Sequence, residues 1–247
     1  MARTADTVAE LAGTYIEKHA FNDVKTCGSN SAAWDGLCND PTTPAERNAI
    51  STFWVAEANT IRETGTWFKA ALAIVEQEGT VDSISDTARL FALVGMAIAD
   101  GVTLSWDTKE RYFTWRPTFA IRQADTDGHA DTAADPAWTS RITSVGATPE
   151  FNSGTSTFAG AASAVIEGFY CHTTISFTFQ ANPASAPRFY ATPLQGAEEA
   201  GRSRIFQGIH FQFSNEDGRR AGRGIGAEIV ATRLRRVGPS SPADSCP

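Results

Sequence analysis

Apolar residues recur at intervals of three and four along most of the chain, and this periodicity predicts a mainly α-helical protein. The longest predicted helix begins at Ser83 or Ser85, which can cap it, and continues to Tyr112, because Pro117 forbids its extension. The other predicted helices cover 1–20, a segment that begins at Thr43-Pro44, 66–77, a segment from 153–157 to Phe169, 194–208 and 215–236.

Polar stretches separate these helices. Residues 22–43 and 123–150 are rich in small polar residues and are predicted to form loops; a loop as long as the second one often has a functional role. Within 173–190, three apolar residues alternate with Ser and Thr, which predicts one short hairpin. The predicted fold is therefore a helical bundle with one small hairpin.

The pattern also predicts three parts of the chain. An N-terminal helix and loop segment covers 1–42, and one helical domain covers 43–236. Residues 237–247 are rich in Pro and Ser and are predicted to form a flexible tail.

Composition narrows the class of protein. Of 247 residues, 42% are hydrophobic and 20% are charged, which is typical of a folded globular protein. The net charge of −7 disfavours a general nucleic-acid-binding surface. The longest apolar run, Leu90–Leu104, is too short to span a bilayer and contains Asp100, so no membrane span is predicted. Arginine supplies 17 of the 21 basic residues, and its planar fork of donors suits oxyanions.

The four cysteines indicate the compartment only indirectly. Cys27 and Cys38 bracket a short polar stretch, and a disulfide between them is the favoured interpretation; four free thiols are the alternative. Cys171 and Cys246 stand alone in the sequence. A disulfide would favour a secreted or periplasmic location, although residues 1–20 lack the apolar centre of a signal peptide.

Three segments combine residue types that suit oxyanion chemistry. Ser153 and Gly154 lie where a loop enters a predicted helix, so backbone N–H groups and the helix dipole can face an anion. Three basic side chains would neutralise negative oxygens, and one imidazole can act as a nucleophile or as a metal ligand. The segments are Lys109-x6-Arg116-Pro117, Pro149 to Ser156, and Ser203-Arg204-x5-His210. The alternative is that these residues only cap and pack helices, but three cations in a core without an anion would repel each other.

In this order, the segments resemble a superfamily pattern of K-x6-RP, then PSGH, then SR-x5-H. The sequence is similar to the vanadium-dependent haloperoxidase family, which shares its helical fold with the type-2 phosphatidic acid phosphatases and bacterial class A acid phosphatases. The resemblance extends over about 43–236 and includes the short segments Ala88-Arg89-Leu90-Phe91 and Gly208-Ile209-His210-Phe211.

The resemblance implies a role for each matching residue. His210 would bind vanadium in a haloperoxidase or attack phosphorus in a phosphatase. Vanadate is the implied cofactor, or phosphate in the same pocket, and the implied reactants are hydrogen peroxide with a halide or an organic substrate. The residues implied to hold the oxygens are Lys109, Arg116 and Arg204 by their charge, Ser153 by its hydroxyl and Gly154 by its N–H.

The sequence departs from the pattern at several positions. Thr155 stands where the family has its acid–base histidine, and threonine does not titrate near neutral pH. Losing such a group typically lowers the rate by about 10²–10⁴. The predicted catalytic set is thus His210, Lys109 and Thr155. Ser214 stands where relatives often carry an aspartate that orients the ligand histidine, and Glu216 or Asp217 would have to replace it. Asn152 replaces the proline of PSGH.

The chain is also shorter than familiar haloperoxidases, which carry a further N-terminal helical half. A partner chain, such as a second copy in a homo-oligomer, would then cover the exposed face, or the chain is a truncated form. Three functional hypotheses follow: a vanadate-dependent haloperoxidase, a phosphoester hydrolase with His210 as its nucleophile, and a non-catalytic oxyanion-binding protein.

Overall fold

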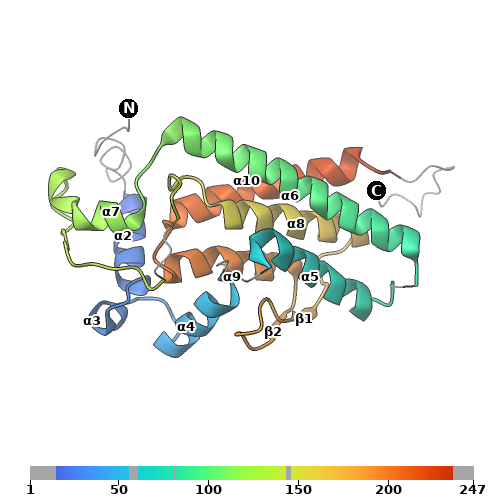
Figure 1. Cartoon of the computed structure of the whole chain (residues 1–247), viewed down its shortest axis with the longest axis horizontal. Helices are drawn as coiled ribbons and strands as arrows, with labels where there is room; N and C mark the ends of the chain where they lie inside the picture. Colours follow the sequence, from blue (N-terminus) through green and yellow to red (C-terminus); the bar gives the residue numbers. More distant parts are fainter. Residues whose placement is uncertain (1–14, 56–60, 81, 143–145, 236–247) are drawn as a thin grey trace. The chain divides into compact units, whose positions relative to one another are not determined.

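The structure is a computed structural model that describes residues 15–55, 61–80, 82–142 and 146–235. Helices dominate these residues, so the predicted mainly helical fold is confirmed (Figure 1). The elements in chain order are α2 (Tyr15–Cys27), α3 (Ala32–Asp35), α4 (Pro44–Phe53), α5 (Arg62–Gln77), α6 (Ile84–Tyr112), α7 (Pro117–Arg122), the 3₁₀ turn η1 (Ala124–Thr126), α8 (Gly154–Tyr170), β1 (Phe177–Phe179), β2 (Arg188–Tyr190), α9 (Pro193–Phe206) and α10 (Gln212–Thr232).

Local signals in the sequence determine several of these boundaries. The Thr43 hydroxyl accepts a hydrogen bond from the Glu46 N–H, as expected of a cap before α4. The Ser83 hydroxyl accepts one from the Asp86 N–H at the start of α6, which runs to Tyr112 as predicted. The predicted hairpin is also present, and Phe177 of β1 pairs with Tyr190 of β2 in antiparallel register.

The prediction of one loop over 22–43 is wrong in part. Helix α2 continues to Cys27, and α3 forms a further turn within the same stretch. The reason is that Phe21, Val24 and Cys27 recur every three residues and are all buried, so one helical face persists beneath the polar residues. Of the helix predicted over 1–20, residues 1–14 lie outside the described residues.

The sequence analysis also missed α7. Pro117 ends any continuation of α6, but it stands at the first position of α7, where its missing N–H is no loss. Arg116 is extended there, with φ −67° and ψ 153°, so the chain turns sharply between the two helices. The predicted loop over 123–150 begins with η1 and otherwise has no regular element among its described residues.

Contacts divide the chain into two compact units. Helices α4, α6, α9 and α10 contribute residues to both. The first unit groups Met1–Ser51, Ser105–Ser153 and Gly201–Asp217, and the second groups Thr52–Leu104, Gly154–Ala200 and Gly218–Pro247. The predicted parts 1–42, 43–236 and 237–247 stay predictions, and the last of them lies outside the described residues.

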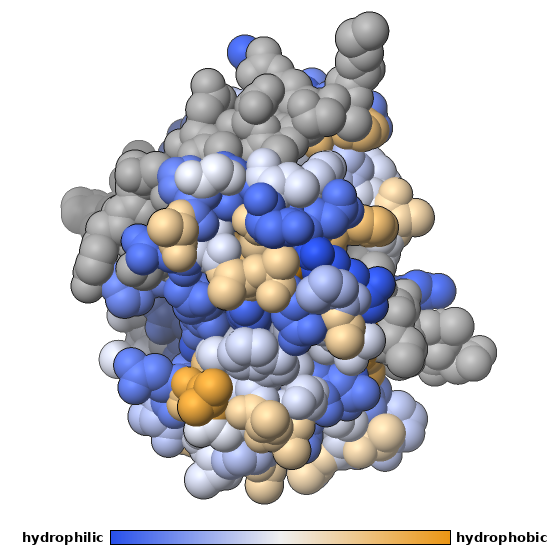
Figure 2. All heavy atoms as spheres, turned by 90° about the vertical axis from the view of Figure 1, so that its left-hand side faces the viewer, coloured by the Kyte–Doolittle hydropathy of each residue, from blue (hydrophilic) through white to orange (hydrophobic). Residues whose placement is uncertain are grey.

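The first unit has its own apolar core. Phe21 and Val24 of α2 lie with Ile121 of α7, Trp138 and Phe211 in one buried cluster. Helix α2 packs against both α3 and α7. Figure 2 looks onto the side of this unit where α2, α3 and α7 lie, and its hydrophobic residues are interspersed with hydrophilic ones.

The second unit is built around α8. Helix α5 packs against both α8 and β1. Helices α8 and α10 approach closely: a Cβ on Gly160 would lie 2.3 Å from the Arg219 carbonyl oxygen, and one on Gly222 would lie 2.0 Å from that of Thr157. Only glycine allows this backbone contact. Small residues thus bring the two helices together.

The cysteines that the structure describes are disulfide-bonded rather than free. Cys27 and Cys38 form the predicted bond, which ties the end of α2 to the segment that follows α3. Cys171 is also disulfide-bonded, so the alternative of four free thiols is wrong, and Cys246 lies outside the described residues.

One stretch, Ile84–Arg122, is long and apolar enough to satisfy the length and composition criteria for a membrane span. A core helix of a globular protein can satisfy the same criteria, and Leu90, Leu93 and Val94 are fully buried. The absence of a membrane span therefore stays a prediction.

Candidate functional site

Lys109 lies in the last turn of α6, in the first unit. Its Nζ donates hydrogen bonds to the carbonyl oxygens of Pro149 at 2.7 Å and Glu150 at 3.0 Å. The side chain is only slightly exposed, so its ammonium group is held at a fixed point by the backbone of the 149–150 segment. Two of the predicted motif segments therefore meet.

Arg116 brings the third predicted segment to the same place. Its Nε and Nη2 donate to the carbonyl and hydroxyl oxygens of Thr148, at 2.9 and 3.0 Å. Its Nη1 donates to the carbonyl oxygen of Ile209 at 2.9 Å and lies 3.0 Å from Nε2 of His210. Because a guanidinium group only donates, Nε2 of His210 must be the acceptor.

The other imidazole nitrogen faces a carboxylate. Nδ1 of His210 lies 2.9 Å from Oε1 of Glu150, and this oxygen also accepts the N–H of Phe211 at 2.9 Å. Since Nε2 is an acceptor, Nδ1 carries the proton and donates it to Glu150. Glu150 is fully buried and His210 is 3% exposed. The imidazole ring is therefore bonded at both nitrogens.

The sequence analysis did not assign Glu150 a role, although it lies three residues before Ser153 in a quoted motif. It expected Glu216 or Asp217 to orient His210 instead. Glu216 accepts a hydrogen bond from Gln212 at 2.9 Å, and the carboxylate at the imidazole is that of Glu150. Nothing in the spacing links Glu150 to a histidine 60 residues later, so only the fold could reveal the pair.

Burial and neighbouring charges shift the pKa values of three groups in this cluster. Burial, and then repulsion by Arg116, lowers the pKa of Lys109 to about 7. Burial raises the pKa of Glu150 to about 7, despite its hydrogen bond from the Phe211 N–H. Burial, and then repulsion by Arg116 and Lys109, lowers the pKa of His210 well below its ordinary value. His210 is therefore neutral at physiological pH.

Arg204 and Ser153 are the remaining predicted site residues of the first unit. Arg204, on α9, is buried and donates from Nη1 to Oε1 of Gln207 at 2.7 Å. Its charge acts on both Lys109 and His210, which places it in the same group of cations. Ser153 is fully buried, and its N–H donates to the carbonyl oxygen of Ser214 at 3.2 Å.

Gly154 and Thr155 belong to the second unit, where they begin α8. The Thr155 hydroxyl donates to Oε1 of Glu63 at 3.2 Å, within that unit. The roles that the family pattern gives to these two residues therefore stay predictions. The structure brings four predicted site residues of the first unit together: Lys109, Arg116, Arg204 and His210.

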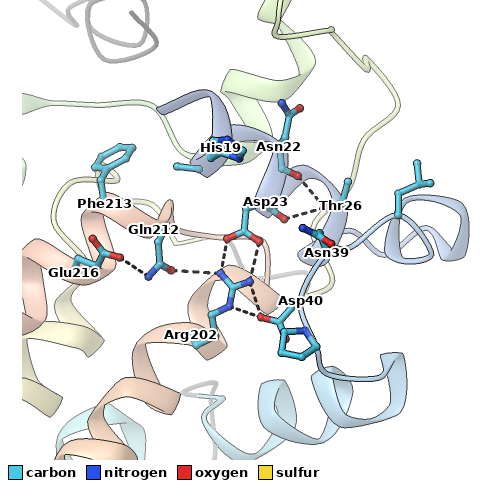
Figure 3. A pocket seen from close by; sticks show the side chains of 13 residues that line it. His19, Asn22, Asp23, Thr26, Asn39, Asp40, Arg202, Gln212, Phe213 and Glu216 are labelled. Atoms are coloured by element: carbon cyan, nitrogen blue, oxygen red, sulfur yellow. Dashed lines mark hydrogen bonds and ion pairs between the residues drawn. The ribbon is translucent and has the colours of Figure 1, made fainter. Parts of the chain in front are cut away.

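A pocket of about 550 Å³ also lies in the first unit, and it shares no lining residue with this cluster. Arg202 is among its lining residues, and Figure 3 shows its guanidinium group between Asp23 and Asp40. Its Nη1 also donates to Asp23 and, at 3.4 Å, to Gln212. Burial alone would lower the pKa of Arg202, but the two aspartates raise it above its ordinary value. This arginine is saturated by its own partners.

Comparisons with known proteins agree with the fold. Vanadium chloroperoxidase of Curvularia inaequalis is 35% identical over 95 residues, which are 35% of this chain and 15% of that protein. A bacterial vanadium-dependent iodoperoxidase structure matches with a TM-score of 0.70 at 24% identity, covering 89% of this chain and 49% of that one. A bacterial vanadium-dependent chloroperoxidase in its apo form matches with a TM-score of 0.61 at 15% identity, covering 87% and 48%.

The two structural matches are below 25% identity and show the fold alone, and the chain spans about half the length of either one. The family described as the VCPO second helical-bundle domain matches residues 89–238, which include all the predicted site residues. Because this match covers more than half of the sequence, the resemblance is confirmed, and the chain belongs to the vanadium haloperoxidase-like family of VCPO second helical-bundle domains.

Proposed function

We propose that this chain carries the active site of a vanadate-dependent haloperoxidase, which oxidises a halide with hydrogen peroxide. The observation that carries the proposal is the neutral His210 imidazole, bonded at both nitrogens inside a buried group of cations. Family membership supports the reaction class, since the curated relative is a vanadium chloroperoxidase.

The residues present fit an oxyanion such as vanadate. Three buried cations, Lys109, Arg116 and Arg204, lie close enough together that their charges lower the pKa values of Lys109 and His210. Their mutual repulsion would be relieved by a guest that carries negative charge. Arginine in particular presents two parallel N–H donors to tetrahedral oxyanions. The excess of positive charge therefore favours an anion over a metal cation.

His210 is the proposed ligand of vanadium. With its proton on Nδ1, the ring keeps a lone pair on Nε2, and this lone pair accepts from Arg116 Nη1 at 3.0 Å. A guest bound through Nε2 would take over this lone pair, so Arg116 would transfer its N–H from the imidazole to an oxygen of the guest. Arg116 would thus donate to Nε2 of His210 before the anion binds, and to an oxygen of the anion afterwards.

Each remaining residue would have one task. Bound vanadate would supply a Lewis acid that activates hydrogen peroxide without changing its own oxidation state. Lys109 and Arg204 would neutralise oxygen charge, and the Ser153 hydroxyl would donate one hydrogen bond. The family pattern further assigns the Gly154 N–H to an oxygen.

Thr155 favours a second candidate function, a protein that binds an oxyanion without turnover. The Thr155 hydroxyl already donates to Glu63, and a hydroxyl cannot act as an acid or base near neutral pH. Anion binding would survive the loss of the acid–base histidine better than turnover would.

Three measurements on the full chain distinguish these functions. We expect orthovanadate to bind, as seen by calorimetry, and to support peroxide-dependent oxidation of at least one of chloride, bromide and iodide. Binding without activity over a range of pH would favour the second candidate. Hydrolysis of a small aryl phosphate, inhibited by orthovanadate, would instead identify a phosphoester hydrolase with His210 as its nucleophile. Absence of binding would refute all three.

A further inference from the structure

Glu150 has an unusual set of contacts for a buried carboxylate. Its Oε1 accepts two hydrogen bonds, from Nδ1 of His210 and from the N–H of Phe211, both at 2.9 Å. Its Oε2 is buried, with no hydrogen-bond partner among the described residues. Glu167 of the second unit likewise has one buried oxygen with no such partner, so what distinguishes Glu150 is that its bonded oxygen accepts from an imidazole.

The carboxylates of the pocket differ in this respect. Both oxygens of Asp23 accept from Arg202, and both oxygens of Asp40 accept, from Thr42 and from Arg202. Hydrogen bonds to both oxygens offset the cost of burying a carboxylate, and these two carboxylates have them. Glu150 instead directs its one bonded oxygen at an imidazole and at the residue after it.

The backbone around Glu150 is held in place on several sides. The N–H of Glu150 donates to the carbonyl oxygen of Thr114 at 3.0 Å, and the N–H of Phe151 donates to the Thr114 hydroxyl at 2.9 Å. The carbonyl oxygen of Glu150 accepts from Lys109. A carboxylate on so constrained a segment can define the orientation of a ring that it contacts.

From these contacts we infer that Glu150 is a positioning residue for His210: its carboxylate holds the proton on Nδ1 and thereby presents the Nε2 lone pair to the oxyanion. The inference rests on the proposed function for its last clause only. An imidazole without this acceptor could place its proton on Nε2, where it would block a ligand. Glu150 touches neither the reacting atoms nor the guest.

Two variants of nearly equal shape isolate the hydrogen bond. Glu150→Gln keeps an acceptor oxygen, whereas Glu150→Met removes it, and neither side chain is charged. Any difference between them therefore reports the hydrogen bond and excludes the effect of charge. Glu167→Gln, in the second unit, is the matched control, because Glu167 is a buried glutamate that accepts from Arg223 instead.

The first readout is the Nδ1 proton of His210, observed by ¹H–¹⁵N NMR of protein labelled in its four histidines and assigned by its loss in His210→Ala. We expect this resonance in the parent protein, in Glu150→Gln and in Glu167→Gln, and we expect its loss in Glu150→Met. The same resonance in both Glu150 variants would overturn the inference. This readout needs no anion, so it tests Glu150 even if the proposed function fails.

The second readout is the affinity for orthovanadate, measured by calorimetry. Loss of a group that orients a ligand histidine weakens binding by about 10–100-fold. We expect Glu150→Met to bind that much more weakly than Glu150→Gln. Equal affinities of the two variants would overturn the role in anion binding. If the parent protein itself bound no orthovanadate, the proposed function would be refuted, and the NMR result would still decide the place of Glu150.

Discussion

Arg202 and Arg204 are two residues apart on α9, and both are largely enclosed by the first unit, yet their surroundings are opposite. Arg202 lies between Asp23 and Asp40, which raise its pKa. Arg204 belongs with Lys109 in a group of cations whose mutual repulsion helps to lower the pKa of Lys109. Positions two apart on a helix point to different sides, so one helix serves both clusters.

The difference shows how to distinguish a structural ion cluster from a binding site. A buried cation whose charge is cancelled by fixed carboxylates has little left to offer a ligand, even when it lines a pocket. Cations that outnumber their carboxylates leave a positive potential that an anion can satisfy. We therefore place the proposed oxyanion site at the cluster around His210, where buried cations repel one another, although the pocket of about 550 Å³ is lined by Arg202.

The prediction with the largest expected effect concerns the imidazole of His210. Its removal is compared with the removal of an imidazole that lines the Arg202 pocket. We expect His210→Ala to abolish orthovanadate binding, because the proposed ligand atom is lost. His19→Ala is the matched control, since His19 is exposed and lines the Arg202 pocket, and it should bind as the parent protein does. Calorimetric titration decides the matter. Retained affinity in His210→Ala would refute the ligand assignment.

A second test asks whether the His210 cluster lacks only an acid–base group. Thr155→His supplies the residue that the family pattern has at this position. A positioned acid or base is typically worth about 10²–10⁴ in rate, so we expect halide oxidation to rise by about 10²-fold. Thr155→Ser, which adds no titratable group, should leave the rate near its starting value. An unchanged rate in Thr155→His would show that position 155 is not the acid–base position.

The two arginines themselves give a direct test of the comparison. Charge-assisted hydrogen bonds contribute about 1.5–3 kcal/mol, so Arg204→Ala should weaken orthovanadate binding by about 10–100-fold. Arg202→Ala should leave that affinity unchanged but lower the free energy of unfolding by about 2 kcal/mol, because two partly buried aspartates lose their partner. Denaturant titration measures the second effect. If instead Arg202→Ala weakened orthovanadate binding and Arg204→Ala only lowered stability, the contrast between the two arginines would be wrong.

Much of this arrangement could be predicted from the sequence, and the failures have physical causes. Helix α6 was predictable because its period, its Ser83 cap and the stop before Pro117 are all local signals. The convergence of Lys109, Arg116 and His210 was predictable from the family pattern rather than from periodicity. Helix α7 was missed because the proline that ends one helix also begins the next.

The partner of His210 illustrates the limit more sharply. Glu150 and Glu216 are both acidic residues near motif positions, and only tertiary structure decides which one meets the imidazole. The sequence offered Glu216 or Asp217, because both are close to His210 in the chain. In the folded protein Glu150 contacts the imidazole, because hydrogen bonds with Lys109 and Thr114 hold its backbone in place. A contact of this kind has no local signature.

The smallest expected effect is a difference in pH dependence between the clusters. The pKa of Lys109 is lowered from 10.5 to about 7, so between these values the unfolded chain keeps a proton that the folded protein has released. Stability therefore rises with pH in this window. The raised pKa of Glu150 acts below pH 7 with the opposite slope, since there the folded protein holds the extra proton. Above pH 7 the contribution of Glu150 fades within about one pH unit, so Lys109 dominates the slope there.

We expect the free energy of unfolding of the parent protein, relative to Lys109→Met, to rise by about 2 kcal/mol between pH 7 and pH 9. In the Arg202 cluster, burial would raise the pKa of Asp40, but hydrogen bonds from Thr42 and the charge of Arg202 outweigh it and lower the pKa. The stability that Asp40 provides is thus lost only in acid, and Asp40→Asn should differ from the parent protein by a constant amount over pH 7–9. Chemical denaturation at several pH values measures both differences. If Lys109→Met also gave a constant difference, the ammonium group would be as well balanced as Arg202, and the contrast between the two clusters would disappear.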